Sequence, residues 1–509
     1  MEQIHALNQA DGEEQEEPAC RTTEMEAARA GFLADYPVFD EAAVQELRRR
    51  EYARLDEQGQ VYLDYTGGGL HAASQIARHM ELLSTRVLGN PHSHNPTSLA
   101  MTELVEGTRA YVLDFFNAAP EEYAAIFTPN ASGALKHVGE SYPFRPGARF
   151  LLTFDNHNSV NGIREFARSR GADVRYVRLV QPDLRLDEIQ LRNELIRIAP
   201  DAPHLFAFPA QSNFSGVQHP LALIDEAQAL GWDVLLDAAA FAPTNRLDLS
   251  VHQPDFVSLS FYKIFGYPTG LGVLLARREA LKKLQRPWFA GGTITIASVQ
   301  GDGHHLADSE AAFEDGTVDY LNIPAVETGL RHINSVGIDT IHDRVAALCA
   351  WLLDALTGLR HSNGLPLLRV HGPATVDRRG GTITATFYGA DGRGMDEQRI
   401  EELANYAGIS LRTGCFCNPG AGEIAHGLTA EEMAAFFQSG DHISFDELRR
   451  VVTCEYQKSI GSIRISLGIA TTFDDVYRMV EFAGRFLDQA AADIGPVAYR
   501  SEHPVRDGV

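Results

Sequence analysis

Residues 234–244, VLLDAAAFAPT, and residues 259–272, LSFYKIFGYPTGLG, each join a short apolar run to a polar turn. Asp237 comes directly after three apolar residues, and Lys263 lies between an apolar run and a glycine-rich turn. A buried carboxylate needs a cationic partner, and a lysine amine that is sufficiently neutral can form a Schiff base. Taken alone, Lys263 is better explained as a solvated loop lysine.

Similar apolar runs recur from about residue 98 to residue 330. Residues 98–117 have the spacing of an amphipathic helix, and each later run is followed by a polar loop and a helix-like segment. The predicted strands are Ala125–Thr128, Phe150–Phe154, Val174–Leu179, Leu205–Phe208, Val234–Leu236, Val257–Ser260 and Leu271–Ala276. This alternation predicts an α/β fold with a mainly parallel sheet and helices on both faces. Such folds bind ligands beyond the carboxyl ends of their strands.

The sequence changes character after about residue 336. A long helix is predicted through Ile341 and Leu356, then a strand in which Ile383, Ala385 and Phe387 alternate with polar residues, so a smaller α+β domain is expected. The predicted division is an acidic extension that is flexible or a loosely docked helix (1–35), a segment packing with the small domain (36–75), the large domain (76–335) and the small C-terminal domain (336–509).

The composition limits the classes of partner. The chain has 509 residues, 44 Lys and Arg against 68 Asp and Glu, and a formal net charge of -24. This charge repels phosphate backbones, so we expect neither nucleic acid nor an anionic membrane surface as a partner. Five cysteines are too few for a disulfide framework and indicate a reducing compartment. With no secretory signal or membrane-spanning run, we expect a cytoplasmic protein.

Residues 126–139, IFTPNASGALKHVG, indicate a strand that ends in small polar residues and opens a helix. Backbone N–H groups of Ala131, Ser132 and Gly133 would then point at the helix N-terminus, which suits a phosphate. The same residues also form an ordinary helix cap. Together with Asp237 and Lys263, this candidate phosphate site matches pyridoxal phosphate, whose ring nitrogen needs an acid and whose aldehyde needs a lysine.

The chain resembles the class V aminotransferase family of pyridoxal-phosphate enzymes. Within that family it resembles the cysteine-desulfurase-like module of molybdenum cofactor sulfurases. The resemblance runs from about Tyr62 to Leu487. It rests on the stretches YLDYTGGG, GNPHSHN, FTPNASGALK, DNHNSVNGIRE, SFYKIFGYPTGLG, FEDGTVDYLNI, LRTGCFCNPG and SIRISLG. It implies a fold-type I transferase with a large pyridoxal-phosphate domain, a small amino-acid substrate and a homodimer with shared active sites.

The resemblance also implies roles for individual residues. Lys263 is similar to the lysine that binds the cofactor aldehyde, Asp237 to the partner of the pyridine nitrogen, and His157 to the histidine that stacks on the ring and moves protons. Asn213 resembles the asparagine that approaches the cofactor 3-oxygen. The family's phosphate-contact positions are matched by Ala131, Ser132, Ser260 and Tyr262. Thr317 matches the position that reaches the phosphate of the neighbouring subunit.

The segment LRTGCFCNPG, residues 411–420, determines the predicted reaction. Its register against desulfurases places Cys417 at the nucleophile position, where Arg412 and a cationic cofactor would lower the pKa of the thiol. The implied mechanism has Lys263 remove the α-proton of bound cysteine, Cys417 take the sulfur as a persulfide, and alanine leave. Cys415 is an alternative acceptor or a resolving thiol. A Cys-x-Cys pair is also a fragment of a zinc site, but no second pair accompanies it, and we expect no metal.

Arg464 is placed by its strand pattern. Ile463, Ile465 and Leu467 alternate with it, so one strand face is expected to be buried while Arg464 projects from the other. In the family this arginine binds the substrate α-carboxylate, for which a planar fork is suited. The simpler reading is a surface salt bridge. Arg412 is assigned to substrate binding with it.

Two departures from the family pattern are visible. Ala240 stands where many desulfurases have a glutamine, and residues 66–69, TGGG, would permit positive φ and a close backbone approach. The leading hypothesis is a cysteine desulfurase or C–S lyase acting on L-cysteine or a related amino acid, with a separate sulfur-acceptor protein. The alternatives are an aminotransferase, epimerase or decarboxylase of a specialised amino acid, and a scaffold subunit with a vestigial site.

Overall fold

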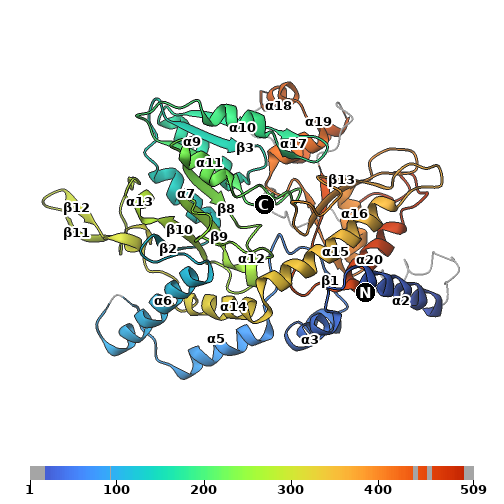
Figure 1. Ribbon diagram of the computed structural model, residues 1–509, viewed down its shortest axis with the longest axis horizontal. Coiled ribbons are helices and arrows are strands. Elements are labelled where there is room, and N and C mark those ends of the chain that lie inside the picture. The colour runs from blue at the N-terminus through green and yellow to red at the C-terminus, as the bar shows by residue number, and fades with distance from the viewer. Residues whose placement is uncertain (1–17, 92, 439–444, 455–460, 498–509) are drawn as a thin grey trace.

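The computed structural model describes residues 18–91, 93–438, 445–454 and 461–497 (Figure 1). Its centre is a seven-stranded sheet in the order β2-β10-β9-β8-β7-β3-β4. These strands are β2 (Tyr123–Thr128), β3 (Arg149–Thr153), β4 (Asp173–Val177), β7 (His204–Pro209), β8 (Asp233–Asp237), β9 (Phe256–Ser260) and β10 (Gly272–Arg277). Strand β10 is antiparallel to both neighbours, and β9, β8, β7, β3 and β4 are parallel, so the predicted mixed, mainly parallel α/β fold is confirmed.

Both faces of the sheet are buried, because successive side chains of a strand enter two different cores. In β10, Val273 and Leu275 belong to one apolar cluster, whereas Leu274 and Ala276 belong to the other. The helices that flank these strands are α6 (Pro96–Phe115), α7 (Ala131–Ser141), α8 (Asn158–Asn161), α9 (Ile163–Ser169), α10 (Glu188–Leu195), α11 (Leu223–Ala229), α12 (Phe261–Phe265), α13 (Arg278–Leu281) and α14 (Ile323–Val336). A strand covered on both faces reads as a continuous apolar run, which is why the sequence located these strands.

The small domain is built on a four-stranded antiparallel sheet in the order β13-β14-β17-β16. Its strands are β13 (Leu368–His371), β14 (Thr382–Phe387), β16 (Arg412–Gly414) and β17 (Ser462–Ser466), and its helices are α15 (Ile338–Gly358), α16 (Glu397–Tyr406), α17 (Pro419–His426), α18 (Ala430–Phe437), α19 (Phe445–Cys454) and α20 (Phe473–Gly484). Ile463 and Ile465 of β17 belong to the apolar core, as the strand pattern predicted. The opposite face, which carries Arg464, is buried as well, because it turns toward the large domain.

The N-terminal segment lies against the small domain. Helix α2 (Pro18–Asp35) is docked there through Phe32, which is buried and stacks on Phe473. Helix α2 covers residues 18–35 of the predicted extension, and residues 1–17 lie outside the described residues. Helix α3 (Glu41–Glu51) adds a buried ion pair between Arg48 and Asp475, at 2.6 Å.

The remaining elements complete the connections between the domains. They are α4 (Arg54–Glu57), α5 (Ala73–Thr85), the 3-10 turn Ser309–Phe313, the pair β1 (Val61–Tyr62) and β15 (Ile409–Ser410), the pair β5 (Leu179–Val180) and β6 (Arg185–Leu186), and the hairpin β11 (Ile294–Ser298) and β12 (Gly303–Leu306). Strand β1 pairs in parallel with β15 of the small domain. The hairpin stands away from the body of the molecule in Figure 1.

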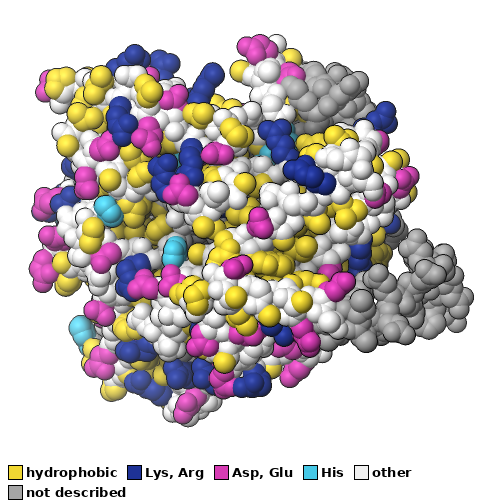
Figure 2. Space-filling model, turned by 45° about the vertical axis from the view of Figure 1, so that its right-hand side comes forward, with side chains coloured by type: hydrophobic (Ala, Val, Ile, Leu, Met, Phe, Trp, Pro, Cys, Tyr) yellow, Lys and Arg dark blue, Asp and Glu magenta, His cyan; other side chains and the backbone are white. Residues whose placement is uncertain are grey.

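Acidic and basic side chains are interspersed over the face drawn in Figure 2 and are not segregated by sign. Within the described ranges, no helix has the length and apolarity needed to cross a membrane.

Candidate functional site

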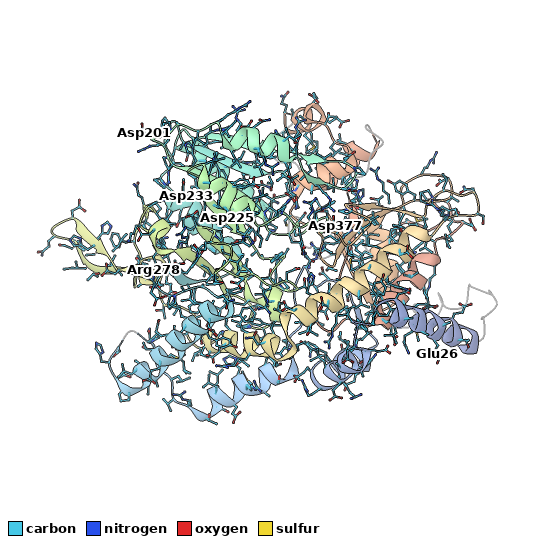
Figure 3. The ribbon with its side chains drawn as sticks, in the orientation of Figure 1. Glu26, Asp201, Asp225, Asp233, Arg278 and Asp377 are labelled. Atoms are coloured by element: carbon cyan, nitrogen blue, oxygen red, sulfur yellow. The ribbon has the colours of Figure 1, made fainter. Side chains whose placement is uncertain are left out.

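The predicted cofactor residues follow strands that run in the same direction. His157, Asn213 and Asp237 lie at the carboxyl ends of β3, β7 and β8, and Ser260 ends β9. Asp233, labelled in Figure 3, begins β8 and so marks the opposite edge of the sheet. This convergence is a property of parallel strands. It brings residues that are far apart in sequence together at the carboxyl ends of the strands.

Asp237 and Lys263 form the centre of this edge. The Oδ1 atom of Asp237 accepts hydrogen bonds from the Ala239 N–H, at 3.1 Å, and the Ser258 hydroxyl, at 3.2 Å. Lys263 lies on the short helix α12. Burial lowers the pKa of its amine, against the attraction of Asp237 and with the repulsion of Arg464. The amine makes no hydrogen bond or ion pair with any described residue, and its lowered pKa favours the neutral, nucleophilic form.

His157 caps the following helix α8. Its Nδ1 accepts the Ser159 N–H at 3.1 Å, which leaves the proton of the neutral ring on Nε2. Burial, reinforced by Lys263, lowers the pKa of His157 to about 4. His157 is therefore neutral near pH 7, with an N–H to donate.

The helix α7 N-terminus differs in part from its prediction. The Ala131 N–H donates to Ser260 Oγ at 2.9 Å, and the Gly133 N–H donates to Asn130 Oδ1 at 2.9 Å. Two of the three predicted phosphate donors are thus capped by side chains here. The Ser132 hydroxyl lies 2.6 Å from that of Ser159, which connects α7 to the His157 segment.

Tyr262 lies beside Lys263 on α12 and is half-buried. Burial raises the pKa of its phenol. A Cβ at Gly68 would lie 3.6 Å from its ring, so the TGGG segment runs along the Tyr262 face.

Arg464 is the buried cation of the small-domain side. Its Nη1 donates to the Asn213 carbonyl at 3.1 Å and its Nη2 to Asp64 Oδ1 at 3.0 Å. The Nε–H is buried and has no partner among the described residues. The guanidinium lies 4.8 Å from the centre of the Phe416 ring. A buried donor without a partner suits an anionic ligand such as a carboxylate.

Asp64 is the main residue that the sequence reasoning missed. It binds Arg464 through Oδ1 and Arg412 through Oδ2, with Arg412 Nε at 3.0 Å and Nη2 at 2.8 Å. Asp64 thus joins the two arginines assigned to substrate binding. The available signal was its place in YLDYTGGG, between the apolar positions Leu63 and Tyr65, which are both buried.

The TGGG segment owes its glycines to close approach. A Cβ on Gly67 would lie 2.5 Å from Asp64 Oδ2 and 2.7 Å from Arg412 Nη2, and one on Gly69 would lie 3.0 Å from the Lys263 carbonyl. The positive φ that glycine would also permit is not used, since Gly67, Gly68 and Gly69 are not among the residues with positive φ. These glycines let the chain pass between the arginine pair and α12.

Cys415 and Cys417 lie in one tight turn. The Asn418 N–H donates to the Cys415 carbonyl at 3.0 Å, and the two central residues, Phe416 and Cys417, have φ of 55° and 54°. Positive φ is strained for a residue with a Cβ. Phe416 offsets this strain by burial, with its ring 5.5 Å from that of Phe214.

The large domain binds this turn mainly through the backbone carbonyl groups of the turn. Asn213 Nδ2 donates to the Phe416 carbonyl at 2.7 Å, and the Asn158 N–H donates to the Cys417 carbonyl at 2.8 Å. Asn418 Nδ2 donates to the Asp155 carbonyl at 2.7 Å and to Asn213 Oδ1 at 2.9 Å. Both polar groups of the Asn213 side chain therefore bind the cysteine turn, a role that the sequence did not predict.

The two turn cysteines have different surroundings. Cys417 is close enough to influence the charge on both Lys263 and Arg464. Burial raises the pKa of the Cys415 thiol. Cys415 is consequently held protonated, whereas Cys417 lies near the Arg464 guanidinium and the Lys263 amine. Cys349 is buried in α15, as its helical position predicted.

Thr317 is not brought into this cluster. It is exposed and lines a cavity of about 370 Å³ together with Gly133, Lys136 and Gly270. One group of metal-capable side chains occurs in the described residues, His137, Glu140 and Asp315. Arg286 donates to His137 and Glu140 and pairs with Asp315, so a cation already balances that cluster.

The chain is similar to known proteins over most of its length. A molybdenum cofactor sulfurase of Solanum lycopersicum is 37% identical over 469 residues, which cover 86% of this chain and 56% of that protein. The chain spans little more than half the length of the curated relatives it matches.

Two solved structures share the fold. A cysteine desulfurase from Thermococcus onnurineus, in its apo form, has a TM-score of 0.72 at 21% identity and covers 87% of this chain and 98% of its own. A C-DES mutant with glycine linked covalently to its pyridoxal-phosphate cofactor has a TM-score of 0.63 at 16% identity, covering 86% and 99%. The Aminotransferase class-V family profile matches residues 61–479, and the chain belongs to that family.

Proposed function

We propose that the protein is a pyridoxal-phosphate-dependent cysteine desulfurase or C–S lyase, which takes sulfur from L-cysteine or a related amino acid. The observation that carries the proposal is the meeting of Cys417 with Lys263 and Arg464 at one edge of the sheet. Membership in the class V family and the sulfurase relatives support it.

The residues present fit pyridoxal phosphate. Asp237 is a buried acid without an ion-pair partner among the described side chains, Lys263 offers an amine with a lowered pKa, and His157 offers a neutral ring. These are the acid, the amine and the aromatic face that the cofactor requires. When bound, the cofactor supplies the electron sink that weakens bonds at the substrate α-carbon.

The chain's own side chains supply binding, proton transfer and the nucleophile. Arg464 has a buried Nε–H for the substrate carboxylate, and Asp64 fixes its orientation. Lys263, once neutral, accepts the α-proton, and the His157 ring offers its one N–H, on Nε2, within the same cluster. Cys417 takes the substrate sulfur and carries it as a persulfide, with alanine as the other product.

The test uses purified holoenzyme and L-cysteine. With a small thiol present as sulfur acceptor, we expect stoichiometric alanine and transferred sulfur, and a Cys417→Ala variant that loses sulfur transfer while keeping the absorbance of the bound cofactor. Alanine formation at the full rate in that variant would contradict the persulfide route. A keto-acid-dependent pyridoxamine spectrum would instead identify an aminotransferase.

We further propose a homodimer and a separate sulfur-acceptor protein. The support for the dimer is Thr317, which is exposed beside the α7 N-terminus and matches the position that contacts the neighbouring subunit's cofactor in the family. Light scattering of the holoenzyme is expected to give twice the chain mass. A monomeric holoenzyme with full activity would exclude shared sites.

A further inference from the structure

The turn at residues 415–418 brings a second thiol to the sulfur-carrying cysteine. Cys415 and Cys417 are the first and third residues of the turn that the Asn418 N–H closes on the Cys415 carbonyl, at 3.0 Å. Residues two apart in the chain have Cα atoms at most about 7.6 Å apart, and closer in a turn. That range overlaps the roughly 4.4–6.8 Å found for disulfide-linked cysteines.

Cys415 lies next to Cys417 in the turn, with Phe416 alone between them. Cys417 is close enough to affect the ionisation of the Cys415 thiol. The turn itself is held by the large domain through Asn158 and Asn213. The two cysteines therefore remain neighbours without any movement of the loop.

The two thiols are unequal in a way that suits successive roles. Cys417 lies near the Arg464 guanidinium and the Lys263 amine, whereas burial raises the pKa of the Cys415 thiol and keeps that thiol protonated. The first attack on the substrate sulfur thus falls to Cys417. Cys415 is kept for a later step, when Cys417 already carries the extra sulfur.

The geometry points to Cys415 as a resolving thiol that discharges the Cys417 persulfide as hydrogen sulfide, an inference that rests on the proposed desulfurase function. The Cys415 sulfur attacks the Cys417 sulfur, a Cys415–Cys417 bond forms, and the bond to the terminal sulfur breaks. The terminal sulfur takes the electron pair and the Cys415 proton, so it is reduced while Cys415 is oxidised. A dithiol reductant then restores both thiols.

This step gives the enzyme two outcomes for the same persulfide. With an acceptor present, the terminal sulfur is transferred before Cys415 reacts. Without an acceptor, each turnover ends in free sulfide and an internal disulfide, and a second turnover waits for the reductant. The disulfide is consumed by thiol-disulfide exchange with the dithiol reductant, and the free sulfide is the substrate of a reaction that assimilates sulfide.

The experiment follows one turnover of holoenzyme with L-cysteine in the absence of reductant, by intact mass, sulfide assay and alanine assay. Wild-type protein is expected to become lighter by two hydrogen atoms and to release one sulfide per alanine. Cys415→Ser is expected to become heavier by one sulfur atom and to withhold sulfide. Cys349→Ser, which alters a buried thiol of α15, is the matched control and is expected to behave as wild type.

The possible outcomes separate the two proposals. A wild-type protein that makes alanine and keeps a stable extra sulfur overturns the resolving role and leaves the desulfurase function standing. No alanine from either wild type or Cys415→Ser overturns the function itself. If Cys415→Ser does not fold, the wild-type peptide spanning residues 413–449 decides, because the disulfide form takes up no alkylating agent until it is reduced.

Discussion

The large-domain side and the small-domain side of the site differ in how their charged groups are paired. On the large-domain side, Asp237 and Lys263 come from neighbouring segments and are not bonded to each other. On the small-domain side, Arg464 and Arg412 share the single carboxylate of Asp64. The first side keeps a neutral amine and a buried acid ready for a ligand, and the second pre-arranges two cations.

This difference separates chemistry from positioning. Changes on the large-domain side remove reacting groups and are expected to act on kcat. Changes on the small-domain side disturb the orientation of the arginines and are expected to act on KM. The following changes test that division.

Replacing Lys263 by alanine tests the large-domain side most severely. We expect kcat for alanine formation to fall roughly a thousandfold or more, because the amine that accepts the α-proton is lost. The Schiff-base absorbance should disappear as well. Lys282→Ala, which alters an exposed lysine paired with Glu279, is the control and should retain both. A Lys263→Ala protein with the wild-type spectrum would refute the assignment.

Buried histidines test the small domain through pH. Burial lowers the pKa of His371 to about 3 and that of His426 to about 4, against about 6.5 in the unfolded chain. Between the folded and the unfolded pKa values, the unfolded state therefore binds more protons than the folded state. The histidines' contribution to the free energy of unfolding is fully present above about pH 6.5 and is lost as the pH falls. Each histidine accounts for on the order of 2 kcal/mol of the loss between pH 7 and pH 5.

The measurement is denaturant unfolding at both pH values. His426→Gln should reduce the difference in the free energy of unfolding between pH 7 and pH 5, because it removes a group that must stay neutral in the folded chain. His305→Gln on the exposed hairpin should leave it as in wild type. An equal pH dependence in His426→Gln and wild type would contradict the prediction.

Asp64→Asn tests the shared carboxylate. We expect KM for L-cysteine to rise roughly ten- to a hundredfold, the equivalent of about 1.5–3 kcal/mol for lost charged hydrogen bonds, while kcat changes less. Asp339→Asn breaks an exposed pair with Arg246 and serves as the control, since such pairs contribute little. A fall confined to kcat would place Asp64 in the chemical step and not in positioning.

Gly67→Ala should also raise KM for L-cysteine, and by the smallest factor of these changes. Its Cβ would lie 2.5 Å from Asp64 Oδ2, so the Arg412 pair must shift, and KM is expected to rise a few-fold. Gly107→Ala meets no atom within 4 Å in helix α6 and should instead stabilise the protein by about 1 kcal/mol. Identical kinetics for Gly67→Ala and wild type would show that the close approach has no role.

The sequence predicted one side of the site better than the other, for a physical reason. Asp237 and Lys263 follow apolar strands directly, so local patterning locates them. Asp64 meets Arg464 across 400 residues of chain, and no local pattern records such a contact. The same holds for Asn213, whose side chain binds a turn 203 residues away. Long-range pairs of this kind need the assembled domains.

The hydrogen bonds around the cysteine turn join its position to the angle between the domains. Residues 415–418 belong to the small domain, whereas Asn158, Asn213 and Asp155 belong to the large one. A hinge rotation that parted the domains would release all of these bonds together and withdraw the thiol from the amine. The position of the nucleophile therefore depends on the packing of the small domain against the large one.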